Sequence, residues 1–313
     1  MATFDTAITA QEGVLSGPYR RPQQMLAVQA YDGHASIHDD STAQKLGFKG
    51  GTIEGPTHFS QFAPLGHAVW GEQFLTAGCI SAHYRAPAFE GEEVKAFLCA
   101  AKDESRQADI WMLRADGVEI LRGTASVGPD FSVSALDARL ATLSPLADPV
   151  ILADVKVGMC APRAPVRMAM DQHMGALYPF SLAQKLAKIT EPSSLYSGAN
   201  NDWGRPIVPL EMISVLMQYS SSANAFQTRG PAVGLFADQE IRLLDGPVFV
   251  DEPYEIEHEI VFLSGSRRTE SMWVRFTLFV AGTTRQVASM LLNVAMMKET
   301  YARYATEYSA RYG

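Results

Sequence analysis

The sequence has few cysteines and no long run of one charge or of apolar residues. Its three cysteines, Cys79, Cys99 and Cys160, are too few and too far apart for a disulfide framework. The formal net charge is −8 with no basic run, which argues against binding to nucleic acid or anionic membranes. No stretch reaches the roughly 18 apolar residues of a membrane span, and the first residues do not resemble a signal peptide. We therefore expect a cytoplasmic protein with neither membrane nor nucleic-acid partners.

Several motifs of catalysis and cofactor binding are also missing. The sequence contains no G-x-S-x-G elbow, Walker loop, dinucleotide fingerprint, H-E-x-x-H motif or Cys/His spacing suited to a metal. It therefore predicts neither a metal ion nor a redox cofactor.

The length and an internal repeat indicate two domains. A chain of 313 residues exceeds the size at which a single core usually stops growing. Similar landmarks recur in the same order, and their separation rises slowly along the chain, as small insertions would cause. The pairs are Phe48 and Trp203 (155 residues apart), Phe89 and Phe249 (160), Trp111 and Trp273 (162), and Ala125 and Ala288 (163). We predict domains at 1–145 and 146–313, with a proline-rich linker around 130–165.

Each half shows the same order of secondary structure. An apolar segment of helical length, Pro56 to about Trp70 or Pro209 to about Phe226, precedes extended segments rich in β-branched and aromatic residues. These patterns predict an α+β protein in which each half wraps an antiparallel sheet around one central helix. Residues 299–313 are expected to form a terminal helix with a tyrosine packing stripe. The extended segments are 79–87, 94–102, 108–116, 120–128, 235–244, 254–263, 271–280 and 286–297.

The segment from Asp32 to Gly55 resembles the signature region of the MaoC-like acyl-thioester hydratases and dehydratases. The family pattern is roughly D-x-N-P-[IL]-H, a short run containing Ala, and then G-F-G-G-P-I-A-H-G at the start of the central helix. The residues that match its downstream part are Ala43, Gly47, Phe48, Gly50, Gly51 and Gly55. The resemblance implies a double hot-dog fold, a pseudo-dimer within one chain, and an acyl-thioester substrate such as acyl-CoA.

The resemblance also implies roles for individual residues. In the family, an Asp and a His share the proton transfers, and the N–H of the glycine that opens the helix polarises the thioester carbonyl. These roles fall on Asp32, on His34 or His38, and on Gly55. An alignment without gaps places the family histidine on Ile37, whereas a one-residue insertion places it on His38, and the sequence leaves both registers open.

The same loop has simpler interpretations. Asp32 followed by glycine is a common turn signal. His38, with the two aspartates and the serine that follow it, is also typical of a helix N-cap with an acidic first turn. The second histidine of the family pattern is replaced by Glu54, which lies four residues before His58. This spacing lets Glu54 and His58 face one cleft, although Glu54 alternatively only complements the helix start and His58 is a core residue.

The second half lacks a comparable acid–base pair. The corresponding loop contains Tyr196, Asn200, Asn201 and Trp203, which we predict bind or orient the substrate, but it contains no histidine. Arg267, at an expected hairpin tip, is a candidate contact for a CoA phosphate. We expect a degenerate second half that enlarges the pocket for a bulky acyl group.

The leading functional hypothesis is a lyase that hydrates or dehydrates an acyl thioester without a cofactor. The loss of the motif Asn and Pro favours an alternative, a non-catalytic or repurposed hot-dog protein that binds an acyl or polycyclic ligand. A thioesterase or isomerase on the same scaffold is a further alternative, because a fold does not determine a reaction. The sequence permits either a monomer or a homodimer of double hot-dog units.

Overall fold

The structure is a computed structural model that describes residues 3–29, 36–100, 105–198, 201–220 and 226–313. Eleven strands in these residues form one antiparallel sheet in the order β1-β2-β4-β5-β6-β3-β8-β11-β10-β9-β7. The strands are β1 (Thr9–Gln11), β2 (Val14–Ser16), β3 (Gly78–Tyr84), β4 (Val94–Ala100), β5 (Gln107–Arg114), β6 (Glu119–Val127), β7 (Cys160–Val166), β8 (Gly234–Leu243), β9 (Tyr254–Gly265), β10 (Thr269–Val280) and β11 (Gln286–Met297). The helices are α1 (Asp40–Lys45), η1 (Gly55–Phe62), α2 (Ala63–Trp70), α3 (Gln73–Ala77), α4 (Ala135–Leu140), α5 (Leu182–Leu186), η2 (Ser194–Tyr196), α6 (Leu210–Gln218), η3 (Lys298–Thr300) and α7 (Tyr304–Tyr312), where η denotes a 3-10 helix.

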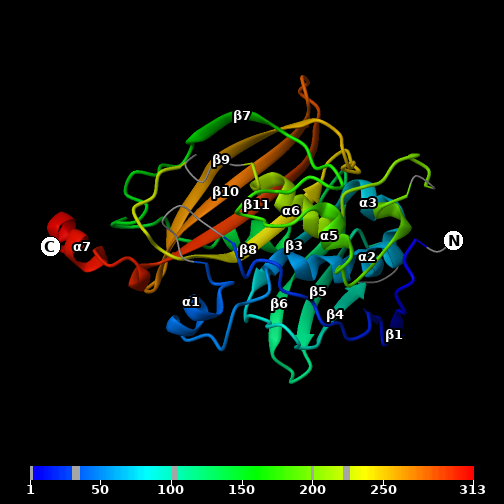
Figure 1. Cartoon of the computed structure of the whole chain (residues 1–313), viewed down its shortest axis with the longest axis horizontal. Coiled ribbons are helices and arrows are strands. Elements are labelled where there is room, and N and C mark those ends of the chain that lie inside the picture. Colours follow the sequence, from blue (N-terminus) through cyan, green and yellow to red (C-terminus); the bar gives the residue numbers. More distant parts are fainter. Residues whose placement is uncertain (1–2, 30–35, 101–104, 199–200, 221–225) are drawn as a thin grey trace.

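The two halves of the chain join edge to edge through β3 and β8. Ile80 of β3 lies opposite Ile241 of β8, and both side chains are fully buried. Strands β4, β5 and β6 continue the sheet on one side of this junction, and β11, β10 and β9 continue it on the other (Figure 1). These eight strands coincide with the eight predicted extended segments. The short strands β1, β2 and β7 at the sheet edges were not predicted.

The predicted repeat has a structural counterpart in each half. Thr52 bridges to Phe89 in the first half, and Ile207 bridges to Phe249 in the second. In both cases, the segment that enters the central helix pairs with the loop that follows the junction strand, namely the β3–β4 loop in the first half and the β8–β9 loop in the second. The predicted pair Trp111 and Trp273 lies on β5 and β10, which occupy the same place in the two strand orders.

The central helices differ from their predicted form at one end each. The helix predicted from Pro56 to Trp70 is helical throughout, but its first eight residues form η1, longer than 3-10 segments usually are. The second helix ends at Gln218, earlier than the predicted end near Phe226. Helices η1 and α6 pack against each other, so a single hydrophobic core spans both halves. No helix of the described ranges is long and apolar enough to cross a membrane.

The segments outside the repeat contain more structure than expected. The predicted linker around 130–165 contains α4, which starts with a capping box between Ser134 and Asp137, and most of β7, which pairs with β9. The C-terminal helix begins at Tyr304 rather than near residue 299, and the rings of Tyr304, Tyr308 and Tyr312 contact one another in sequence along α7. Helix α7 projects from one end of the molecule (Figure 1).

Candidate functional site

A cavity of about 740 Å³ is lined by residues of both halves. The first half contributes polar groups from the start of its central helix and the loop before it. The second half contributes mainly apolar side chains from β8, β10 and β11. The polar residues used below are His38, Glu54, Gly55, His58, Tyr84 and Tyr178, and the apolar wall includes Phe226, Phe236, Val274, Phe276 and Leu292.

Hydrogen bonds of the two aspartates that follow His38 hold its loop in place. The carboxylate of Asp39 accepts a hydrogen bond of 2.8 Å from the Thr42 N–H and so caps α1, as the N-cap interpretation predicted. The Asp40 carboxylate accepts a hydrogen bond of 2.7 Å from the N–H of Gly51. A β-carbon at Gly51 would lie 2.2 Å from the His38 carbonyl oxygen, so this close approach requires glycine. The cap and a role for His38 in the cavity are therefore compatible.

The hydrogen bonding of His38 determines its tautomer. Its Nδ1 lies 2.7 Å from the carbonyl oxygen of Thr52, which can only accept, so Nδ1 carries the proton. Burial lowers the pKa of His38 to about 4. The ring is therefore neutral near pH 7, and its Nε2 is left with a lone pair that can accept a hydrogen bond.

Glu54 and Gly55 form the start of η1 at the cavity. Glu54 occupies the N-cap position, and its side chain makes no capping hydrogen bond. Among the described residues, the Gly55 N–H has no acceptor, as expected for the first residue of a helix. A β-carbon at Gly55 would lie 2.6 Å from Cζ of Tyr84. Tyr84 is itself held by a 2.8 Å hydrogen bond to Gln239 of β8.

Glu54 belongs to a buried cluster of charged and polar groups. Burial raises its pKa to about 7, an effect opposed by the Lys185 ammonium and by a hydrogen bond with Tyr178. Lys185 lies on α5 and is 4% exposed; it donates a hydrogen bond of 2.8 Å to Oγ1 of Thr57 and lies 4.0 Å from Glu211. Burial likewise raises the pKa of Glu211 to about 7. Two carboxyl groups thus share one buried cation.

His58 lies in the same cavity lining as Glu54. Burial lowers its pKa to about 4, and the nearby Lys185 ammonium contributes in the same direction. The Nδ1 atom of His58 has no hydrogen-bond partner within the described part of the chain. Glu54 and His58 therefore share one cavity, as their spacing predicted, without a hydrogen bond between them.

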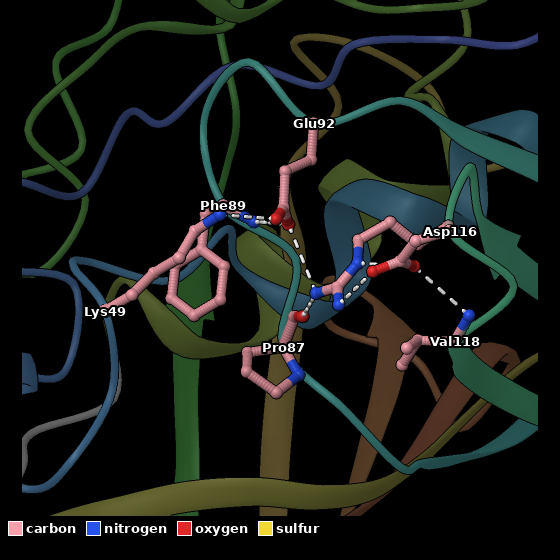
Figure 2. A network of polar contacts seen from close by, with 7 residues as sticks. Lys49, Pro87, Phe89, Glu92, Asp116 and Val118 are labelled. Atoms are coloured by element: carbon pink, nitrogen blue, oxygen red, sulfur yellow. Dashed lines mark hydrogen bonds and ion pairs between the residues drawn. The ribbon is translucent and has the colours of Figure 1, made fainter.

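A surface network anchors the segments that frame the cavity. Figure 2 shows the Glu92 carboxylate accepting hydrogen bonds from the Phe89 N–H (2.9 Å) and the Lys49 ammonium (2.5 Å). Arg114 also contacts Glu92 at 3.4 Å and forms two hydrogen bonds with Asp116, of 2.9 and 2.7 Å. Because Phe89 bridges to the strand-like segment just before Glu54, this network helps to fix the entrance to η1.

The structure brings four of the predicted site residues together. His38, Gly55, Glu54 and His58 all line the cavity. The predicted catalytic residues Asp32 and His34 and the predicted binding residue Asn200 lie outside the described residues.

The other predicted binding residues lie elsewhere. Tyr196 and Trp203 pack in a separate apolar cluster, and the side chain of Asn201 bonds to backbone carbonyls of its own loop. These contacts are structural, because none of the three lines the cavity. Arg267 is exposed in the turn between β9 and β10, beside Ser266, which does line the cavity.

Sequence reasoning missed the residues that reach the cavity or its polar cluster from distant positions. Tyr84 ends β3, Tyr178 and Lys185 come from the segment before η2, and His258 lies on β9. The capping box of Ser181 and Gln184 is a readable sign of a helix at α5. No local pattern, however, indicates that the lysine of this helix is buried beside two carboxyl groups.

Comparisons with known proteins identify the fold. No family model and no curated protein sequence matches the chain. A solved structure from Chloroflexus aurantiacus, described as a MaoC domain dehydratase, aligns over 95% of this chain and 96% of its own, with a TM-score of 0.56 and 14% identity. Rv0216 of Mycobacterium tuberculosis, described as a double hot-dog protein, aligns over 95% and 97%, with a TM-score of 0.53 and 11% identity. The chain has a double hot-dog fold.

The double hot-dog architecture confirms the predicted fold class and agrees with the resemblance to MaoC-like proteins. At these identities the likeness defines the fold and leaves the reaction to be argued from the site. The cavity lies where both halves of the double hot-dog contribute side chains. The first central helix and the loop before it contribute His38, Glu54, Gly55 and His58.

Proposed function

We propose that this protein binds an acyl thioester in the cavity and adds water to, or removes water from, the bond between its α and β carbons. The observation that carries the proposal is the meeting of His38, Glu54 and the Gly55 N–H at one cavity with an otherwise largely apolar wall. The apolar wall suits an acyl chain, and the polar groups suit proton transfer next to a carbonyl.

The proposed reaction uses the two side chains in different ways. The lone pair on Nε2 of His38 orients the attacking water, because its Nδ1 proton is committed to the Thr52 carbonyl. The ionised Glu54 takes a proton as the water oxygen bonds to the β carbon. The electron pair of the carbon–carbon double bond moves toward the thioester, and the protonated Glu54 then delivers the proton to the α carbon. A pKa near 7 suits a group that both accepts and returns a proton.

The start of η1 supplies the stabilisation of the intermediate. Negative charge develops on the thioester oxygen when water adds, and an unpaired N–H at a helix start is suited to bind it. Gly55 provides such a group and has no side chain of its own. Asp32, the motif aspartate, remains a predicted participant, and Arg267 remains a predicted contact for the CoA phosphates.

A panel of enoyl-CoA substrates tests the proposal. Addition of water is followed by loss of the absorbance of the conjugated thioester, and hydrolysis is followed separately by release of free CoA thiol. We expect His38→Ala to lower turnover of the preferred enoyl-CoA by about 10²- to 10⁴-fold with an unchanged circular dichroism spectrum.

Two outcomes would contradict the proposal. Release of thiol without loss of conjugation would establish a thioesterase. Thermal stabilisation by acyl-CoA without turnover of any panel member would establish a binding protein.

A further inference from the structure

His258 is a polar side chain in the apolar part of the cavity. It lies on β9, where Tyr254, Ile256, His258 and Ile260 are buried and the intervening glutamates are more exposed. Its side chain therefore lies on the buried face of the sheet, on the same side as these residues. It lines the same cavity as His38, but from the opposite half of the chain.

One ring nitrogen of His258 is buried without a hydrogen-bond partner among the described residues. The residue is 6% exposed, and its Nε2 atom has no partner in the part of the chain that the structure describes. Its closest ring neighbour, Phe276, approaches edge to face with 4.7 Å between ring centroids and offers no lone pair. Buried polar groups in proteins are nearly always satisfied, so a partner from outside the chain is expected.

The environment indicates which kind of partner fits. Burial lowers the pKa of His258 to about 4, and no charged side chain contributes to this shift. A neutral imidazole packed against the Phe276 ring is poorly suited to a carboxylate or a phosphate. It is suited to a neutral oxygen, because the ring has one N–H donor and one acceptor nitrogen.

The sheet order places His258 far from the proposed reacting end of the ligand. Tyr84, which covers Gly55, ends β3, and β9 lies four strands away through β8, β11 and β10. At about 4.8 Å between strands, the path along the curved sheet is about 19 Å. The cross-strand register also runs from His83, next to Tyr84, to Phe262 of β9, which lies four residues along the strand from His258. A group that contacts His258 would therefore belong to the distal part of an acyl chain rather than to the thioester.

We infer that His258 is a substrate-binding residue that hydrogen-bonds a hydroxyl or keto oxygen on the distal part of the acyl group. This inference rests on the proposed function only in taking an acyl thioester as the occupant of the cavity. It assigns a substrate class, namely acyl thioesters that carry a neutral oxygen remote from the thioester.

Binding of matched saturated acyl-CoA pairs tests the inference without requiring turnover. Each pair consists of a plain acyl chain and the same chain with one hydroxyl, with chain length and hydroxyl position varied across the series. Dissociation constants are measured by calorimetry for the wild type, His258→Leu and the control Phe276→Leu. The control alters the neighbouring apolar wall and leaves the imidazole in place.

We expect the wild type to bind at least one hydroxylated chain about 10- to 100-fold more tightly than its plain counterpart. His258→Leu should lose this preference while binding the plain chain at least as well, and Phe276→Leu should retain the preference. Equal preference in the wild type and His258→Leu, or no preference for any hydroxylated chain, would overturn the inference alone. Failure of every acyl-CoA to bind the wild type would overturn both the inference and the proposed substrate class.

Discussion

The two central helices begin with similar N-cap backbone angles but differ in helix type and in their surroundings. In the first half, Glu54 and Gly55 open the helix at the wall of the cavity. In the second half, Leu210 and Glu211 open it, and Glu211 is buried beside Lys185 rather than at the cavity. Each helix start thus carries one buried carboxyl group, but only the first is placed to contact a ligand. Duplication allows one copy to specialise in chemistry while the other supports it.

The strands of the two halves differ in length, and this difference also separates a proposed catalytic half from a proposed binding half. Strands β3 to β6 have 7 to 9 residues, whereas β8 to β11 have 10 to 12. The longer strands provide most of the apolar wall of the cavity. The second half therefore supplies recognition of the acyl group in this account, and the first half supplies proton transfer.

The largest expected effect on activity comes from replacing the two buried glutamates by glutamine, one at a time. Glu54→Gln should lower kcat/KM by about 10²- to 10⁴-fold, because it removes the proposed proton carrier. Glu211→Gln makes the same chemical change in the second half and should lower kcat/KM less than ten-fold. Both are measured with the preferred enoyl-CoA, and retained secondary structure is verified by circular dichroism.

Asp32→Asn completes this comparison. If Asp32 rather than Glu54 moves the proton, the large loss will appear in Asp32→Asn, and Glu54→Gln will remain within ten-fold of the wild type. Equal losses in Glu54→Gln and Glu211→Gln would contradict the division of labour between the halves.

A smaller loss of activity is expected when a side chain is added at Gly55, at the start of the first central helix. Gly55→Ala should lower kcat by about 10²- to 10³-fold, as expected when one donor to a developing oxyanion is displaced. The added methyl would meet the Tyr84 ring at 2.6 Å, so the helix start must shift. Leu210→Ala at the second helix start is the control, and should reduce stability while leaving kcat of the folded protein within a few-fold.

The control in the second half separates displacement of the Gly55 N–H from loss of stability. The melting temperature of Gly55→Ala is compared with that of Leu210→Ala. If Gly55→Ala keeps wild-type kcat in a folded protein, the proposed role of the Gly55 N–H is wrong.

The smallest effect concerns the pH dependence of activity. Lys185 holds the pKa of Glu54 below the value that burial alone would give. Lys185→Met should therefore raise this pKa and move the acidic limb of the kcat/KM profile to higher pH, with a several-fold loss near pH 7 that recovers above it. The titratable groups around Glu54 that are kept constant in this comparison are Tyr84, Tyr178, His58 and Glu211.

The direction in which the acidic limb moves distinguishes an electrostatic effect on the pKa of Glu54 from a loss of folded structure. Glu211→Gln removes a like charge from the cluster and should move the same limb to lower pH, opposite to Lys185→Met. Lys185→Arg keeps the positive charge and should leave the limb near its wild-type position. A loss of activity in Lys185→Met without movement of the limb would show that Lys185 has only a structural role.

Much of the fold was predictable because it depends on local patterns. Enrichment in β-branched and aromatic residues marked the eight main strands, and the recurrence of landmarks such as Phe89 and Phe249 indicated two similar halves. The early end of α6 at Gln218 was missed because periodicity alone does not locate a helix end, although three serines follow Tyr219 in the sequence.

The site was predictable only in the part that forms one continuous motif. His38, Glu54 and Gly55 lie within 18 residues and were found from that motif. Lys185 reaches the Glu54 cluster, and His258 reaches another part of the cavity, through tertiary packing of segments more than 120 residues away, which no local pattern records. Their importance follows from the burial of Lys185 beside two carboxyl groups and from the buried Nε2 of His258, which has no partner among the described residues.

The most direct test of the account is a crystal structure of Glu54→Gln with an enoyl-CoA bound. We expect the thioester oxygen within about 3 Å of the Gly55 nitrogen, a water near Nε2 of His38, and the acyl chain against β10 and β11. An acyl group outside this cavity, or a thioester carbonyl directed away from η1, would contradict the account.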